Sequence, residues 1–268
     1  MSEITFFLLY LISAGAFAMC RLPRYAANSR VLFIAACVFV AIGILLHSNS
    51  LYSVILTADG FSLSLGNTAS MIGLELAVIG LIAAIEPTLR GMSAGLLVLG
   101  ALAATMTGAS DAADSVTGLT WQIRAHVLVS ILSYGLLTVG AIVAVYGLVH
   151  ERRLRAGQIS AFNQLFAPLE TTERLLFGIA AAGFAGLALA IISGITFVDD
   201  LFAQHLAHKT VFSLLALIVF GALLAGRFFA GWRGRRAVGL YLSGFALLCL
   251  AYFGTRYVLE EVLNRSWG

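Results

Sequence analysis

Eight long apolar segments constrain the fold of this chain of 268 residues more than any other feature. A helix needs about 20 mostly apolar residues to span the hydrocarbon core of a bilayer. The segments that approach or meet this length are 3–20, 31–48, 68–86, 92–108, 123–149, 173–197, 210–228 and 237–259. The alternating pattern of a membrane barrel is absent, and lipid favours helices because their backbone groups pair internally. We therefore predict an all-α, polytopic membrane helix bundle with eight transmembrane helices.

The composition supports a protein that lies almost entirely in the membrane. Hydrophobic residues make up 60% of the chain and charged residues 11%, and the mean hydropathy is +0.98. Soluble domains usually contain about 25% charged residues. No polar stretch is long enough to form a soluble domain, so we predict a single integral membrane domain over residues 1–268. Pro23, Pro87 and Pro168 all lie in predicted connections, as helical spans require.

The basic residues indicate how the helices are oriented. Twelve of the sixteen lysines and arginines lie in alternate connections: Arg21, Arg24, Arg30, Arg90, Arg152, Arg153, Arg155, Arg174, Arg227, Arg233, Arg235 and Arg236. The positive-inside rule places these connections in the cytoplasm and both termini outside. His47, His126, His205 and His208 then lie at the outer edge, and His150 at the inner edge. We predict a multi-pass protein of a bacterial cytoplasmic (inner) membrane.

Several functional classes have no support in the sequence. The positive charges lie in short loops between spans, so the lipid bilayer is the expected partner and nucleic acid is not. The chain contains no P-loop, HExxH or GxSxG motif, and its cysteines form no CxxC pair, so we predict that it is not an enzyme. It also has no CxxCH motif, so any haem would be bound non-covalently.

His126 is the strongest candidate for a ligand-binding residue. It opens the fifth segment, and Ser130 with Ser133 or Tyr134 follows on the same helical face. That polar face is expected to point into the bundle. Arg124 lies two residues away, which suits a haem ligand with a propionate partner nearby, and Trp121 belongs to the same candidate surround. The alternative is an interfacial histidine that bonds a loop carbonyl.

Four other titratable residues carry weaker hypotheses. His47 ends the second predicted segment and is either an interfacial cap or a second axial haem ligand. His205 and His208 have a weak metal-ligand spacing but are favoured as solvated interface residues. Glu75 lies well inside a span, where a carboxylate is by default a functional hypothesis. It is either a proton-relay group or a structural, protonated or paired glutamate, with Arg256 as a possible partner.

The run Gly231-Trp232-Arg233-Gly234-Arg235-Arg236 by itself indicates inner-face anchoring with an interfacial tryptophan. Together with Lys209, Arg227 and Ala251-Tyr252-Phe253-Gly254, however, it resembles the closing helices of the cytochrome c assembly (CcsA-type) membrane protein family. His126-Val127 with Ser133-Tyr134, and Pro168-Leu169-Glu170 before Glu173-Arg174-Leu175, are similar to its YpjD-like branch. The resemblance covers about residues 40–259.

The resemblance implies a haem-binding or haem-handling protein related to cytochrome c biogenesis factors. It implies that haem b is held non-covalently at the outer face by His126 and His47, and that the partner is another membrane or cytochrome-assembly protein. The family's tryptophan-rich motif is replaced here by residues 201–208, and Ala225 stands where a histidine is expected. The alternative is therefore a non-catalytic assembly or regulatory partner that kept the fold and lost the haem site. A small carrier built around Glu75 is a third hypothesis.

Overall fold

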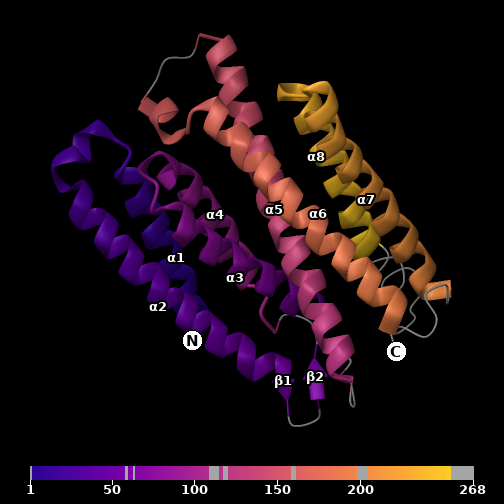
Figure 1. The fold of residues 1–268 in the computed structure, drawn as a ribbon. Coiled ribbons are helices and arrows are strands. Elements are labelled where there is room, and N and C mark those ends of the chain that lie inside the picture. Colours follow the sequence, from indigo (N-terminus) through magenta and orange to yellow (C-terminus); the bar gives the residue numbers. More distant parts are fainter. Residues whose placement is uncertain are drawn as a thin grey trace. The chain divides into compact units, whose positions relative to one another are not determined.

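Helices account for most of the structure (Figure 1). The computed structural model describes residues 2–57, 60–62, 64–108, 115–116, 120–157, 161–197 and 204–254. The α-helices in this part of the chain are α1 (Ser2–Met19), α2 (Ser29–Ile55), α3 (Leu65–Ala83), α4 (Arg90–Ala104), α5 (Trp121–Arg155), α6 (Leu169–Phe197), α7 (Gln204–Ala230) and α8 (Gly234–Cys249). Each predicted apolar segment corresponds to one of them. The predicted all-α bundle is confirmed.

The connections contain short secondary structure that the sequence did not predict. Three are 3-10 helices, η1 (Pro23–Asn28), η2 (Pro87–Leu89) and η3 (Ala161–Leu165), and a π-helical turn η4 (Leu250–Gly254) continues α8. Strands β1 (Leu56–Thr57), β2 (Gly60–Ser62) and β3 (Ser115–Val116) pair antiparallel in that order. Each is two or three residues long. The prolines lie outside the α-helices, as predicted.

The lengths and surfaces of the helices fit a bilayer. Seven helical segments in the described part of the chain are long and apolar enough to cross a membrane, and the first predicted span forms the shorter apolar helix Ile4–Met19. Large apolar side chains point outward, including Leu45 at 70% exposure and Ile218 at 66%. Such exposure is expected where lipid replaces water. The positions of the termini relative to the membrane stay a prediction.

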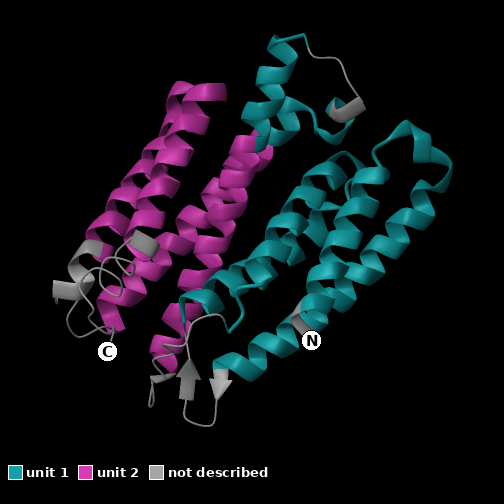
Figure 2. Ribbon diagram, turned by 180° about the vertical axis from the view of Figure 1, so that it is seen from behind, with its two compact units in different colours: residues 1–117, 146–172 teal, residues 118–145, 173–268 magenta. Residues whose placement is uncertain are grey.

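The chain divides into two compact units (Figure 2). Unit 1 contains residues 1–117 and 146–172, and unit 2 contains residues 118–145 and 173–268. The long helices α5 and α6 therefore contribute to both, with only the first four residues of α6 in unit 1. The two units describe only which residues pack together. The predicted single membrane domain over residues 1–268 stays a prediction.

Small residues bring the helices of unit 1 into close contact. α1 packs against α2 and α4, and α3 packs against α4 and α2. Gly73 on α3 faces Gly100 on α4, where a Cβ atom on Gly100 would lie 2.8 Å from the carbonyl oxygen of Gly73. Phe6, Tyr10 and Phe17 fill the core beside α2. Ser70, Gly73 and Ala77, small residues at helical spacing on α3, are all buried and form a packing surface, as such spacing predicts.

Unit 2 uses glycines in the same way. On α6, Gly183 faces Leu137, Gly186 faces Ser133 and Gly194 faces His126, all on α5. The Tyr241 ring from α8 lies against Gly140 of α5, and its hydroxyl donates to the carbonyl oxygen of Leu137 at 3.1 Å. These contacts fix the register of α5 against α6 and α8, and so position the first turns of α5.

Two glycines of α4 allow a matched test of this packing. We expect Gly100→Ala to lower the thermal unfolding temperature in detergent, because the added methyl overlaps a backbone atom that cannot easily move; the cost should be about 1–3 kcal/mol. Gly95→Ala is the control, since a Cβ there meets nothing within 4 Å. It should be neutral or slightly stabilising. Equal unfolding temperatures for the two variants would contradict this packing.

Candidate functional site

His126 lies in the second turn of α5 and contacts α6 within unit 2. Its Nδ1 atom is 2.8 Å from Oγ of Ser193. The Ser193 hydroxyl donates to the carbonyl oxygen of Ala190 at 3.0 Å, so its proton is already used. Ser193 therefore accepts a hydrogen bond from Nδ1–H of His126. This arrangement leaves the lone pair of the neutral imidazole on Nε2.

The packing around the His126 ring holds it in one orientation. A Cβ on Gly194 would lie 3.2 Å from Cε1 of the ring, so the glycine admits the imidazole against the backbone of α6. Ser130 Oγ donates to the backbone carbonyl of His126, not to its ring. The residue as a whole is half-buried. An imidazole fixed through Nδ1, with Nε2 unprotonated, is the usual arrangement of a histidine that binds a metal.

The other members of the predicted surround lie at the start of α5. Trp121 is the first residue of the helix and is 72% exposed, and Arg124 is also exposed. No hydrogen bond joins either side chain to the His126 ring within the described residues. Their predicted role beside a ligand therefore stays a prediction.

The sequence did not indicate a second group of side chains at this end of unit 2. Lys209 lies near the start of α7 and is partly buried. Its Nζ atom is 5.3 Å from the centre of the Tyr252 ring in η4. The Tyr252 ring is in turn 5.8 Å from the Tyr134 ring of α5. Of this group, the helical pattern indicated only Tyr134, as a possible member of the polar face that follows His126.

His47 has a different environment, in the core of unit 1. The ring is fully buried, stacked on Phe6 with centroids 4.7 Å apart. Its Nδ1 lies 3.2 Å from the Tyr10 hydroxyl, and its Nε2 lies 2.7 Å from Oγ of Ser70. Because α2 continues to Ile55, His47 is not a cap at a helix end. The predicted cap was wrong because the polar run after His47 remains helical.

The hydrogen bonds around His47 run in one direction. Thr107 donates to the carbonyl oxygen of Ala104 at 2.8 Å, so it accepts from Ser70 at 2.6 Å. Ser70 then accepts from Nε2–H of His47, and Tyr10 donates to Nδ1. Both ring nitrogens are therefore satisfied within the protein. His47 could bind iron only if it first gave up one of these bonds.

Of the remaining histidines and acidic candidates, Glu75 and His150 lie in unit 1, and the side chains of the others lie outside the described residues. Glu75 lies on α3, and its Oε2 atom is buried without a hydrogen-bond partner among the described residues. The side chains of His205 and His208, and the whole of Arg256, lie outside the described part. At the other helix end, His150 stacks on Phe166 with ring centroids 4.7 Å apart. Within the described residues, no group of three or more His, Cys, Asp or Glu side chains could hold a metal ion.

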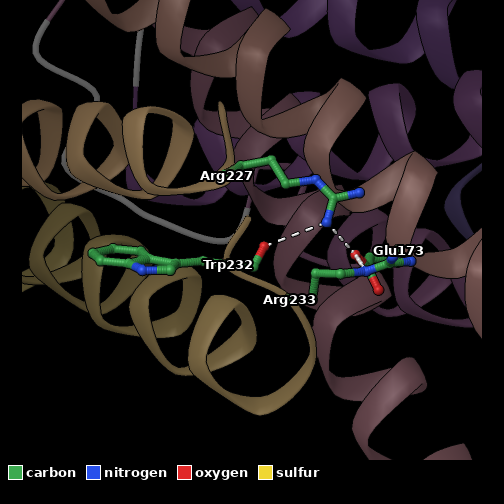
Figure 3. A network of polar contacts seen from close by, with 4 residues as sticks. All are labelled: Glu173, Arg227, Trp232 and Arg233. Carbon is green, nitrogen blue, oxygen red and sulfur yellow. Dashed lines mark hydrogen bonds and ion pairs between the residues drawn. The ribbon is translucent and has the colours of Figure 1, made fainter. Parts of the chain in front are cut away.

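The arginine-rich run forms an ion cluster at the opposite end of unit 2 (Figure 3). Oε1 of Glu173 on α6 accepts from Nη1 of Arg227 at 2.7 Å and from Nε of Arg233 at 2.8 Å. Arg227 also reaches the carbonyl oxygen of Trp232 at 3.4 Å. The Trp232 ring lies on Gly226, and the Arg236 guanidinium lies 4.0 Å from its centre. The run therefore also fastens α6 to the turn between α7 and α8.

The two polar groups lie about one membrane thickness apart within unit 2. Glu173 and Ser193 are both on α6, and a separation of twenty residues corresponds to about 30 Å of helix. This length is close to the thickness of a bilayer hydrocarbon core. From the order of the helices, the first residues of α5 and α7 lie at the same end of unit 2 as the last residues of α6 and α8. The His126 group and the Glu173 group therefore belong to opposite membrane faces.

Comparisons with known proteins define the class of this one. The family described as cytochrome C assembly protein matches residues 2–263. The chain therefore belongs to the cytochrome c assembly protein family. Inner membrane protein YpjD of Escherichia coli K12 is 35% identical over 137 residues, which are 51% of this chain and 52% of that protein. Cytochrome c biogenesis protein CcsA of Guillardia theta is 26% identical over 159 residues, 53% of each chain.

These relatives confirm the predicted CcsA-type family and its YpjD-like branch. The matched segment covers only about half the length of these relatives, for example 52% of the length of YpjD. No solved structure matches the chain. The family and the apolar helices together identify a multi-pass protein of the bacterial inner membrane, as the sequence predicts.

The buried position of His47 leads to a stability prediction. We expect His47→Ala to destabilise the protein by about 2–5 kcal/mol, because it creates a cavity and leaves Tyr10 and Ser70 without their partner. Tyr10→Phe keeps the ring and removes one hydrogen bond, so it should cost only about 1 kcal/mol. Chemical denaturation in mild detergent measures both. Equal destabilisation by the two variants would argue against this network.

The ion cluster gives a second stability prediction. We expect Glu173→Gln to lower the unfolding temperature by several degrees, since two arginines lose a shared, partly buried carboxylate. Glu151→Gln is the control, because Glu151 pairs with the 70% exposed Arg155 side chain at i,i+4, and such pairs contribute about 0.3–0.5 kcal/mol. Thermal unfolding of the purified protein measures the difference. A change no larger for Glu173 than for Glu151 would contradict the anchoring role.

Proposed function

We propose that this protein handles haem during cytochrome c biogenesis and binds or presents it at the outer membrane face. The observation that carries the proposal is the hydrogen bond from Nδ1 of His126 to Ser193, which leaves Nε2 as an available ligand atom. Membership of the cytochrome c assembly family supports it. The relatives named cytochrome c biogenesis protein CcsA support it as well. The outer face follows from the positive-inside rule.

The residues at His126 fit one axial position of haem b. Haem would be the cargo, held non-covalently, with His126 donating the Nε2 lone pair to its iron. Ser193 would keep the imidazole oriented and make it more basic as a ligand. Arg124 and Trp121 would lie on the side that faces water. We propose that the protein performs no covalent chemistry of its own and acts with a cytochrome-assembly partner.

Absorbance spectroscopy tests this proposal directly. We expect the detergent-purified protein to show a Soret band on titration with haem, and His126→Ala to remove or weaken it. Ser193→Ala should weaken binding roughly 10- to 100-fold, the usual effect of losing the partner of a ligating histidine. His150→Ala is the matched control, since that histidine lies at the other end of α5. A Soret band that is identical in wild type and His126→Ala would refute the role of His126.

The geometry of His47 supports a second candidate. With both nitrogens of His47 bonded within the protein, the described residues supply one histidine in place of the predicted pair. A chain that kept the fold and lost haem binding would act as an assembly or regulatory partner. It would then co-purify with another membrane protein, and His126→Ala would leave that association unchanged. Dependence of the association on both haem and His126 would favour the first proposal.

A further inference from the structure

The turn between α7 and α8 carries more positive charge than its own contacts neutralise. Its arginines are Arg227, Arg233, Arg235 and Arg236. Within the described residues, Glu173 is the one carboxylate that contacts them, and Arg227 and Arg233 share its Oε1 atom (Figure 3). Arg235 is exposed and has no hydrogen bond, ion pair or ring contact with the described part of the chain. Two arginines of this turn therefore have no carboxylate partner there.

The backbone of the turn holds the Trp232 ring, and the ring holds Arg236. Gly231 has a φ of 63°, and the N–H of Trp232 donates to the carbonyl oxygen of Gly226 at 3.0 Å. A glycine in this left-handed conformation followed by such a bond is the Schellman ending of a helix. The Trp232 ring lies on Gly226, and the Arg236 guanidinium lies 4.0 Å from the ring centre. Stacking uses the flat face of a guanidinium, so its N–H edge stays available to oxygen atoms.

The stability of α8 does not explain the position of these two arginines. Arg235 and Arg236 lie in the first turn of α8, where the positive end of the helix dipole disfavours cations. Arg233, the residue before the helix, makes no capping hydrogen bond through its side chain. The two charges therefore oppose the local electrostatics of the helix. An anion bound between them would offset this repulsion.

Two phenylalanines beside the arginines show what kind of anion fits. Phe228 and Phe229, in the last turn of α7, are each 83% exposed, and their ring centroids lie 5.0 Å apart. They directly follow Arg227 in the chain and precede the interfacial Trp232. Aromatic rings and arginines are enriched together at the membrane–water boundary. A soluble anion would contact only the arginines, whereas a ligand with an anionic head and apolar chains would contact both kinds of side chain.

We propose that the turn between α7 and α8 binds the phosphate of an anionic phospholipid. Arg235 and the N–H edge of Arg236 donate to the phosphate oxygens, because arginine forms paired hydrogen bonds with phosphate. The acyl chains of the lipid lie against Phe228 and Phe229. The positive-inside rule assigns this face to the cytoplasm, where basic clusters next to a membrane helix bind anionic lipids. This lipid site is independent of the proposed haem function and lies at the other end of unit 2.

Thermal unfolding in a neutral detergent, with added lipid, tests the proposal. A ligand that binds only the folded protein raises the unfolding temperature as its concentration increases. We expect this rise with phosphatidylglycerol, but not with zwitterionic phosphatidylcholine or with soluble glycerol 3-phosphate. Arg235→Gln should shift the phosphatidylglycerol titration to about fivefold higher concentration, the size expected for one basic residue at an anionic surface. Without lipid it should unfold like wild type, because Arg235 has no contact to lose within the described residues.

A matched arginine separates a defined site from general surface charge. Arg152 lies near the end of α5 on the same predicted face, is exposed, and has no side-chain partner in the described part of the chain. Arg152→Gln removes the same charge, and we expect it to leave the phosphatidylglycerol titration unchanged. Equal shifts for Arg152→Gln and Arg235→Gln would overturn the site, as would a wild-type titration in the double variant Arg235→Gln, Arg236→Gln. Stabilisation by glycerol 3-phosphate equal to that by phosphatidylglycerol would overturn the lipid and assign the arginines to a soluble phosphate.

Discussion

The cost of an unpaired polar group in an apolar surrounding is the constraint on which the rest of this structure depends. Several hydroxyls within the helices satisfy this constraint by donating to the backbone carbonyl oxygen four residues earlier. Ser13 donates to Leu9, Ser93 to Leu89 and Thr138 to Tyr134. These bonds need no second helix, so they fix no tertiary contact. Histidine has no comparable local partner here. Its ring must find acceptors and donors on other helices, and the identity of those partners determines what chemistry the ring retains.

His47 and His126 show how the direction of one hydroxyl determines whether an imidazole keeps an unused lone pair. In both cases a serine hydroxyl donates a hydrogen bond to another oxygen atom and accepts a hydrogen bond from the imidazole. At His47 that serine faces Nε2, and Tyr10 uses the remaining lone pair on Nδ1. At His126 the serine faces Nδ1, so the lone pair stays on Nε2. The two histidines are therefore chemically different, because the serine binds Nε2 of His47 but Nδ1 of His126.

The fold could be predicted from sequence, whereas only part of the site could. The lengths of the apolar runs and the positions of Pro23, Pro87 and Pro168 define the helices well, because lipid permits few alternatives. His126 could be found from the polar face of its own helix. The environment of His47 could not, since Tyr10, Ser70 and Thr107 come from distant segments and the polar residues after His47 indicated a helix end. The contact between Lys209 and Tyr252 joins α7 to a π-helical turn, which has no simple sequence signal.

The ion cluster at Glu173 and the His126 group are connected through the rigidity of two helices. Glu173 fastens the beginning of α6 to the end of α7, so neither helix can slide along the other without separating charges that share one carboxylate. Ser193 lies near the far end of α6, and Lys209 lies near the start of α7. The ion cluster therefore helps to set the position of one relative to the other from the opposite end of these helices. In unit 2, the arginine-rich run contributes to the geometry of the histidine site without touching it, because α6 and α7 transmit the register across the bilayer.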